Sequence, residues 1–386
     1  MAWDTYNEWY TGTGGDDTTG DGTSHATRWL TVQKALDSMT TGQRNRLNCT
    51  GSETLSSTLN LTTYGSPGLG TELLIQGYTS TAGDGGVFAI NGGTNSIFNE
   101  GKPNIGWRNL KFTNWGSSNR CINTGGANVI TECEFDGEGS HALVGDFEGF
   151  FTFANNKVHG IVGSSTSATF NLNGGYFANN YIQQDSATQA HDTLYVQGGS
   201  MRIESNVFSL NTTVAVKVIN LISDNNQVYH NTIFNQAACT GTGINLGRTT
   251  DDYGSAYNNI ICGFSGTGGV GIKSTVQTVN LYGNNKFWNN TTDEDVVGDL
   301  IIDIGGSESL LSNPFTSTGN ADHNDDDFTL LSGVRGDAWS GGLYDPDDAF
   351  GSRNLNTRDV GALQSAAAGG GGGGLLRVNM NGNVFG

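Results

Sequence analysis

The sequence predicts an all-β chain wound into a solenoid of the parallel β-helix type. Three observations support this prediction. A short phrase returns at a regular period, two apolar positions flank one polar position in each copy, and the copies consist of strand and turn residues. The phrase reads apolar, any residue, polar, Asn, any residue, apolar, as in 153–158 and 177–182.

The asparagine of this phrase marks the period of the repeat. It stands at Asn156, Asn180, Asn206, Asn231, Asn259 and Asn285, and Leu110 and Cys133 hold the same place in two earlier copies. Successive positions are 23, 23, 24, 26, 25, 28 and 26 residues apart. A propeller blade needs roughly 40 residues, whereas a repeat of about 25 fits one coil of three short strands and three bends.

Two apolar columns frame this polar one. Two positions after it stand Phe112, Phe135, Val158, Ile182, Phe208, Ile233, Ile261 and Phe287. Three positions before it stand Trp107, Ile130, Phe153, Phe177, Ile203, Val228, Ala256 and Tyr282. Helical repeats would show an apolar stripe of period about 3.6 in good helix formers. The Gly, Asn, Thr, Val, Ile and Phe of these units favour strands and turns instead.

The asparagine column has a physical role in such a coil. The chain must bend sharply once per turn, and asparagine tolerates the left-handed conformation that a bend requires. Coils stack about 4.8 Å apart, so inward amides can hydrogen-bond to each other and to the backbone of the bend. We expect the six asparagines to form a ladder.

The coil length, the asparagine ladder and the flanking segments resemble the right-handed parallel β-helix proteins of the pectate-lyase-like superfamily, over roughly residues 20–364. The resemblance implies a right-handed solenoid with an N-terminal helix cap and a C-terminal cap segment. These motifs are specific for the fold and carry little information on function.

Residues 1–50 are predicted to form an N-terminal arm and a capping helix, and residues 51–304 the β-helix. Trp29, Val32, Leu36 and Met39 fall on one helical face, which suits a helix that covers the open end of a solenoid. The arm also carries four aromatic residues, Trp3, Tyr6, Trp9 and Tyr10. We expect them to pack over that end of the solenoid; the alternative is that they contact another subunit.

Residues 305–364 are predicted to form the C-terminal cap, because 313–315, 327–330 and 359–364 resemble closing segments of β-helix proteins. The acidic runs of this segment are candidate Ca²⁺ ligands, with solvated loop charge as the favoured reading. They are Asp322, Asp325, Asp326, Asp327, Asp345, Asp347 and Asp348. No cofactor is required by the sequence, and no metal site is assigned.

Residues 365–386 are predicted to be a glycine-rich linker and a terminal assembly peptide, because Gly369 to Gly374 form an unbroken glycine run. The peptide either adds as a strand to a neighbouring virion protein or folds back on its own cap. Its apolar residues are Leu375, Leu376, Val378, Met380, Val384 and Phe385.

The composition excludes several classes of function. The formal net charge of −19 repels phosphate backbones, so nucleic acid is not an expected partner. No run of 18 apolar residues exists, and the start at Met1 lacks the pattern of a secretory signal, so we expect export by another route such as host lysis. The five cysteines have no metal-like spacing and are expected to be small core fillers rather than disulfides.

Two groups of residues are candidates for chemistry on the outer faces of the coils. Asp136, His159 and Asp185 fall at nearby ladder offsets, so His159 is expected between carboxylates as a catalytic group. His141 and His191 share an offset two coils apart, with acids near them in sequence. This second group is a candidate ligand-binding site of His141, Asp146, Glu148, His191 and Asp192. Acids on β-helix bends are more often simply solvated.

Pectin hydrolases of this superfamily carry Asn-Thr-Asp, paired Asp, Gly-His-Gly and Arg-Ile-Lys motifs, and this sequence lacks the set. The sequence therefore favours a non-catalytic structural or attachment protein on the exterior of a phage particle, such as a tail spike, fibre or decoration, in contact with host glycans. The resemblance to phage spikes of this fold, which are commonly trimers, leaves a homotrimer of this chain open. The alternative is a polysaccharide lyase or glycoside hydrolase, on a virion or extracellular.

Overall fold

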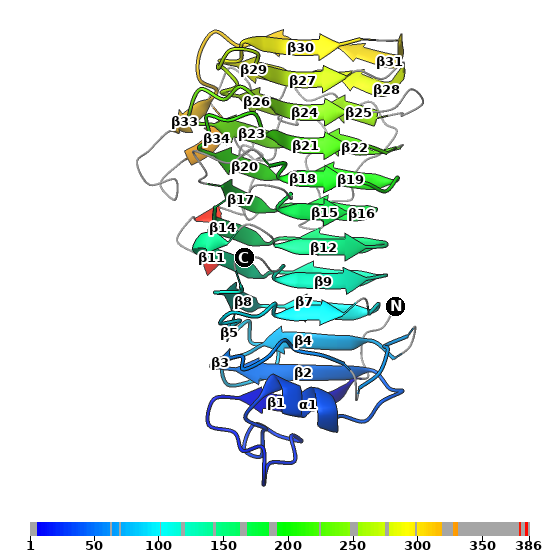
Figure 1. Ribbon diagram of the computed structural model, residues 1–386, viewed down its shortest axis with the longest axis vertical. Helices are drawn as coiled ribbons and strands as arrows, with labels where there is room; N and C mark the ends of the chain where they lie inside the picture. The colour runs from blue at the N-terminus through cyan, green and yellow to red at the C-terminus, as the bar shows by residue number, and fades with distance from the viewer. Residues whose placement is uncertain are drawn as a thin grey trace, which may run out of the picture.

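The chain winds into a parallel β-helix (Figure 1). The computed structural model describes the chain except for residues 1–5, 62–63, 69–70, 101, 117–119, 142–143, 163–167, 185–190, 224, 248–253, 275–277, 298, 319–326, 331–377, 380–382 and 385–386. Three parallel sheets, here named A, B and C, run the length of the rod, and each coil contributes one strand to each sheet in most of the stack. The predicted fold class is confirmed.

Sheet A contains twelve strands. They are β1 (Asn7–Gly12), β2 (Asn45–Thr50), β4 (Leu73–Gly77), β7 (Ile105–Arg108), β10 (Asn128–Thr131), β13 (Phe151–Ala154), β16 (Gly175–Ala178), β19 (Met201–Glu204), β22 (Gln227–Tyr229), β25 (Gly254–Tyr257), β28 (Thr278–Gly283) and β31 (Asp299–Gly305).

Sheet B contains eleven strands, and sheet C nine. Those of sheet B are β3 (Ser52–Thr54), β5 (Phe88–Asn91), β8 (Leu110–Thr113), β11 (Glu134–His141), β14 (Lys157–Ile161), β17 (Tyr181–Gln184), β20 (Val207–Leu210), β23 (Thr232–Asn235), β26 (Ile260–Cys262), β29 (Lys286–Trp288) and β32 (Glu308–Ser309). Those of sheet C are β6 (Phe98–Glu100), β9 (Ile122–Gly125), β12 (Gly145–Glu148), β15 (Phe170–Leu172), β18 (Leu194–Val196), β21 (Lys217–Leu221), β24 (Thr242–Leu246), β27 (Val270–Ser274) and β30 (Thr292–Val296).

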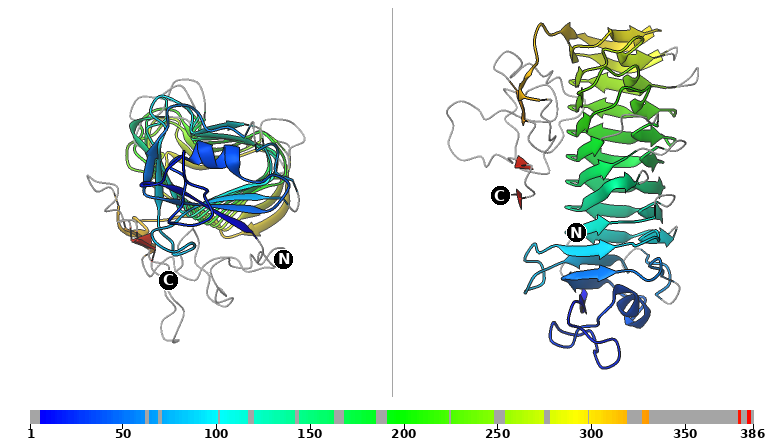
Figure 2. Two further views of the ribbon diagram at one scale, coloured as in Figure 1. Left: turned by 90° about the horizontal axis from the view of Figure 1, so that it is seen from below. Right: turned by 60° about the vertical axis from the view of Figure 1, so that its left-hand side comes forward.

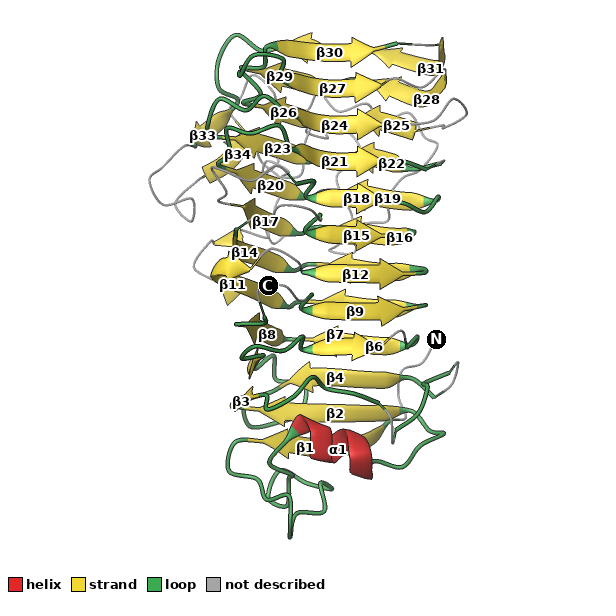
Figure 3. Ribbon diagram, viewed as in Figure 1, coloured by secondary structure: helices red, strands yellow, loops and turns green. Residues whose placement is uncertain are grey.

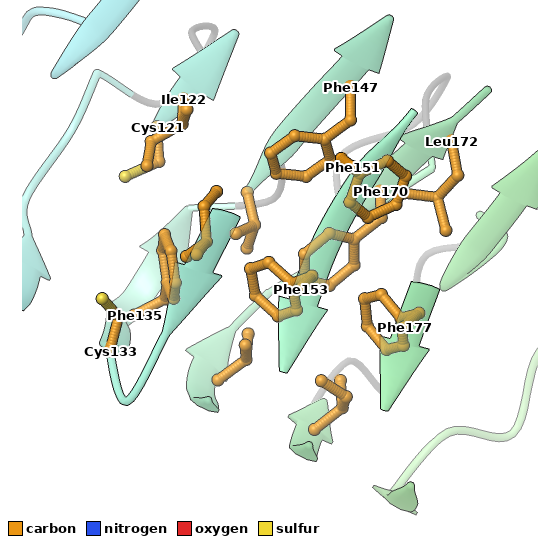
Figure 4. Packing of buried hydrophobic residues seen from close by; sticks show 14 of the residues in the cluster. Cys121, Ile122, Cys133, Phe135, Phe147, Phe151, Phe153, Phe170, Leu172 and Phe177 are labelled. Carbon is orange, nitrogen blue, oxygen red and sulfur yellow. The ribbon is translucent and has the colours of Figure 1, made fainter. Parts of the chain in front are cut away.

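The two apolar columns of the repeat line the interior of the rod. Phe153 and Phe177 pair across β13 and β16 of sheet A, and Phe135 and Val158 across β11 and β14 of sheet B. All four are buried, and the rings of Phe153 and Phe177 stack at 5.1 Å between centroids (Figure 4). Each such side chain contributes roughly 1.5–3 kcal/mol when it leaves water, and because the contacts join adjacent coils, the core holds each coil to the next.

The asparagine ladder is present along its full predicted length. The Oδ1 of Asn180 accepts two hydrogen bonds from Asn156, one from its backbone N–H at 2.9 Å and one from its side-chain Nδ2 at 3.2 Å. The same pair of bonds joins each ladder asparagine to the next as far as Asn285. Cys133 begins the ladder, and its backbone N–H donates to Asn156 Oδ1 at 2.9 Å.

The bend itself lies one residue earlier than the sequence suggested. A left-handed residue with φ between 49° and 61° precedes each of the eight ladder positions; these residues are Asn109, Glu132, Asn155, Asn179, Ser205, His230, Asn258 and Asn284. The ladder asparagines are not left-handed. They hold the bend through hydrogen bonds, while the preceding residue turns the chain.

The N-terminal end is covered as predicted. Helix α1 (Val32–Ser38) lies across the first coil (Figure 3). Its buried side chains Val32, Ala35 and Leu36 continue the core, together with the buried flanking residues Trp29 and Met39. Thr31 caps it by accepting from the Lys34 backbone N–H. Within the arm, β1 pairs with β2 in sheet A and Trp9 stacks on Trp29 at 5.6 Å. Strands of the solenoid therefore begin before residue 51.

The last coil closes the core with polar residues. β30, β31 and β32 end the three sheets, so solenoid strands also continue past residue 304. At the inner register positions Glu294 pairs with Ile272, and Ser309 pairs with Phe287. Tyr282 donates its hydroxyl to Glu294 at 2.7 Å. Inward-facing charge at a sheet edge discourages further strand pairing.

The described part of the predicted C-terminal cap does not lie over this end. Strands β33 (Phe315–Ser317) and β34 (Asp327–Leu330) form an antiparallel pair beside the rod (Figure 2). Phe315 and Phe328 are buried there against Phe234 on the outer face of sheet B. The reason is an apolar patch on that face, made by Tyr181, Val207, Phe234, Ile260 and Cys262.

Of the predicted assembly peptide, only two short strands are described. β35 (Val378–Asn379) pairs antiparallel with β36 (Asn383–Val384). Leu375, Leu376, Met380 and Phe385 lie outside the described residues, as do the acidic runs apart from the backbone of Asp327. No helix among the described residues is long and apolar enough to cross a membrane.

The five cysteines are buried free thiols; they are Cys49, Cys121, Cys133, Cys239 and Cys262. Burial raises the pKa of each of them, and that of Cys133 reaches about 12. Cys49, Cys121, Cys133 and Cys239 fill the core as small apolar groups, whereas Cys262 belongs to the apolar patch on the outer face of sheet B.

Candidate functional site

The structure brings together part of the first predicted group, on the outer face of sheet B. Asp136 in β11 and His159 in β14 are register partners on adjacent coils, and both side chains point outward and are partly buried. Asp185, the third predicted member, lies outside the described residues.

Two residues that the sequence did not single out complete this cluster. Glu134 stands two positions before Asp136 on β11, so both side chains are on the same face of the strand. Lys111 pairs with Glu134 across β8 and β11. We call Lys111, Glu134, Asp136 and His159 the sheet B cluster.

The contacts within the sheet B cluster are close. His159 Nε2 is 2.7 Å from Glu134 Oε1, and His159 Nδ1 is 3.7 Å from Asp136 Oδ1. Lys111 Nζ is 3.2 Å from Glu134 Oε1 and 3.2 Å from Asp136 Oδ2. His159 therefore lies between Glu134 and Asp136, whereas the sequence analysis expected it between Asp136 and Asp185.

Glu134 is held in its ionised form. The hydrogen bond from His159 lowers its pKa most, and Lys111 lowers it further; together they outweigh partial burial and bring the pKa of Glu134 from 4.5 to about 2. A carboxylate of this kind is a ligand or an ion-pair partner at neutral pH. It is a poor proton donor, because a general acid needs a pKa near the working pH.

The second predicted group is divided between two sheets. Asp146 and Glu148 lie in β12 of sheet C, and Asp192 lies shortly before β18 of the same sheet. His141 lies at the end of β11 in sheet B, where its backbone pairs with Ile161. The two histidines therefore do not share a register position, because β11 runs on to His141 through an irregularity in its pairing.

His191 belongs to the packing of the coil. It is buried, and its Nε2 lies 2.9 Å from Gln184 Nε2 and 3.2 Å from Thr169 Oγ1. Such contacts fix the side chain in the interior of the turn, so the predicted role of His191 as a ligand is not supported by its position.

The two aspartates near sheet C have raised pKa values. Burial raises the pKa of Asp146 although Arg120, at 2.9 Å, opposes the shift. Burial likewise raises the pKa of Asp192, against a hydrogen bond of 2.6 Å from Asn220. Glu148 is exposed at the end of β12.

Asp146 is one member of a row of polar residues on the outer face of sheet C, which we call the sheet C row. Register pairing places one member on each of seven consecutive strands from β9 to β27. They are Asn123, Asp146, Asn171, Tyr195, Asn220, Asn245 and Lys273. Asn245 donates to Asn220 Oδ1 at 2.8 Å, so part of the row is hydrogen-bonded along the rod.

Sequence reasoning missed this row as a unit. The signal was the recurrence of asparagine at the middle position of the sheet C strands, as in 122–124, 170–172 and 219–221. These strands vary in their distance from the ladder asparagine, because the connections before them differ in length. A single fixed offset therefore does not align them.

No family model matches the sequence, and no curated protein matches it. Among solved structures, the A-module of the mannuronan C-5 epimerase AlgE6 from Azotobacter vinelandii is similar to this chain. The match has 10% sequence identity and a TM-score of 0.30, and it covers 70% of this chain and 92% of that chain. Similarity at this level carries no inference about function, and the β-helix rests on the strand pairing described above.

Proposed function

We propose that this protein is a non-catalytic rod on the exterior of a phage particle, and that it binds host-surface glycans along the sheet C row. The observation that carries the glycan-binding part of this proposal is the row itself, in which seven consecutive strands place Asn, Asp, Tyr or Lys at one outward register position. Five of the seven side chains are partly exposed, whereas Asn220 and Asn245 are buried.

The chemistry of the row suits an extended sugar chain. Each asparagine amide offers two donors and one acceptor oxygen, and these complement hydroxyl groups, which both donate and accept. Tyr195 stands among the amides and is partly exposed, so its ring can stack on the apolar face of a sugar. Rungs spaced about 4.8 Å apart repeat these groups along the length of a polymer.

The acids on the two faces favour binding over cleavage. Glu134 and Asp136 are ion-paired with Lys111, and Asp146 is ion-paired with Arg120. Hydrolysis of a glycosidic bond needs two carboxyl groups that flank the bond, one of them protonated. The sheet B cluster does not provide the protonated member, since the pKa of Glu134 is about 2.

A second candidate function, as a glycoside hydrolase or polysaccharide lyase, is favoured by one observation. Burial raises the pKa of both Asp146 and Asp192, which is the direction that a general acid requires. Asp146 is a member of the row that would bind the sugar chain, and Asp192 accepts a hydrogen bond from its member Asn220.

The test uses purified protein and polysaccharide from the host surface. Binding is measured by isothermal titration, and cleavage by new reducing ends and by absorbance of unsaturated products. We expect binding without cleavage, and a loss of binding of at least tenfold in the double variant Asn171→Ala, Tyr195→Ala. Thr152→Ala, an outward and partly exposed residue of sheet A, is the matched control and should bind normally.

Cleavage that is abolished by Asp146→Asn or Asp192→Asn would establish the enzyme instead. The absence of both binding and cleavage would refute a glycan role for this face. The position on the virion is tested separately, by mass spectrometry and antibody labelling of gradient-purified particles. Absence of the protein from intact particles would contradict that part of the proposal.

A further inference from the structure

We propose that Glu134, Asp136 and His159 form a binding site for one divalent transition-metal ion, of the Zn²⁺ class, on the outer face of sheet B. This site is independent of the glycan face, because its three ligands come from β11 and β14 of sheet B.

The strand geometry places three metal-ligating side chains close together. Glu134 and Asp136 are two residues apart on β11 and therefore project from the same face. His159 is the register partner of Asp136 on the next coil, so its imidazole projects beside them. One donor atom from each residue lies within 4.8 Å of the other two. Ligands around one zinc ion are at about 2.0–2.2 Å from it, so small side-chain rotations bring these donors to bonding distance.

The donor set selects the type of ion. Ca²⁺ and Mg²⁺ take oxygen ligands almost exclusively, whereas an imidazole nitrogen with carboxylates suits zinc and neighbouring first-row metals. Both carboxyl groups bind the ion in their ionised form. Three protein ligands would leave one position of a tetrahedral ion for water.

Lys111 is the competitor for this site. Its ammonium group lies 3.2 Å from both Glu134 and Asp136, where it supplies the positive charge that the carboxylates require. A metal ion has to displace it, which weakens binding in the wild-type chain. Removal of Lys111 should therefore strengthen metal binding, while removal of His159 should weaken it. A purely structural ion-pair network gives no reason for these opposite effects.

The experiment measures Zn²⁺ binding to the full chain by titration against a chromophoric zinc indicator, and Co²⁺ binding by its visible absorption. Wild-type protein, Lys111→Met, His159→Ala and Glu134→Gln are compared after circular dichroism confirms their folding. We expect one site in the wild type, affinity at least tenfold higher in Lys111→Met, and affinity at least tenfold lower in His159→Ala and Glu134→Gln. Ca²⁺ should not compete at equal concentration.

His25→Ala is the matched control, because His25 is a histidine elsewhere whose Nδ1 lies 2.7 Å from the Tyr78 hydroxyl. It should bind Zn²⁺ as the wild type does. Equal affinity of wild type and His159→Ala, or the absence of binding even in Lys111→Met, would overturn the proposal. Neither result bears on glycan binding, which is measured with variants of sheet C.

Discussion

Replacing Asn206 by alanine tests the asparagine ladder where it is most enclosed. Asn206 is fully buried in the middle of the ladder. Its Oδ1 accepts the backbone N–H of Asn180 at 3.0 Å and the Nδ2 of Asn180 at 2.9 Å. Its own Nδ2 donates to the carbonyl of Phe177 and to Asn231 Oδ1, both at 2.9 Å. Alanine removes all four bonds.

The expected loss of stability follows from these four bonds. Each intramolecular hydrogen bond contributes about 1 kcal/mol net, so the four together amount to about 4 kcal/mol. Some partners keep another bond, since Asn180 Nδ2 still donates to the Phe153 carbonyl. The backbone N–H of Asn180 loses its side-chain acceptor, and an unsatisfied buried donor alone costs about 1–3 kcal/mol. We therefore expect a loss of about 2–4 kcal/mol.

The measurement is the free energy of unfolding from urea titration, followed by circular dichroism. Asn171→Ala is the control, because Asn171 is a partly exposed asparagine on the outer face of sheet C. It should change the free energy by less than about 0.5 kcal/mol, as exposed positions usually do. If Asn206→Ala loses less than about 1 kcal/mol, the ladder does not stabilise the rod and the argument fails.

Three further predictions concern other parts of the rod. Folding lowers the pKa of Glu134 from 4.5 to about 2. The ionised carboxylate therefore contributes fully to the free energy of unfolding above pH 4.5, and this contribution is lost as the pH falls toward 2. In denaturation titrations at a series of pH values, Glu134→Gln should lose this part of the pH dependence. Phe328→Ala removes a ring that packs on Phe234. Limited proteolysis should then cut the chain near the β33–β34 pair, while the melting temperature of the rod stays unchanged. Proteolysis that is the same as in the wild type would contradict the packing. The five buried thiols should resist a thiol reagent at pH 8 until denaturant unfolds the chain, and fast labelling of the native protein would show that one of them is accessible.

The sequence predicted the interior of the rod well, because the interior repeats. Inward positions such as Phe153 and Phe177 meet the same neighbours on every coil, so one residue type suits each column. The ladder asparagines repeat for the same reason. The bend could not be placed to the residue, because Asn155 and Asn156 are adjacent asparagines and only the backbone shows which one is left-handed.

The outer faces were predicted less well, because their columns do not repeat. Glu134 and Lys111 occupy the same outward register position as Lys157 and Tyr181 on nearby coils. These four residues are of three types, so the column gives no periodic signal. His159 and Asp136 were found only because they fell at a fixed distance from the ladder.

The same outward column explains where the C-terminal segment goes. It is charged at Lys111, Glu134 and Lys157, becomes apolar or neutral in the middle coils, and is charged again at Lys286 and Glu308. Its middle members are Tyr181, Val207, Thr232 and Ile260. An exposed apolar patch on a soluble surface is unfavourable and draws a covering segment.

The end of the solenoid needs no such cover, since Glu294 and Ser309 replace the apolar inner residues of the coil before. The segment that follows the last coil carries Phe315 and Phe328, and these find their apolar partners along the side of the rod. The placement of Phe315 and Phe328 on sheet B follows from these two changes of residue type, one inside the rod and one outside it.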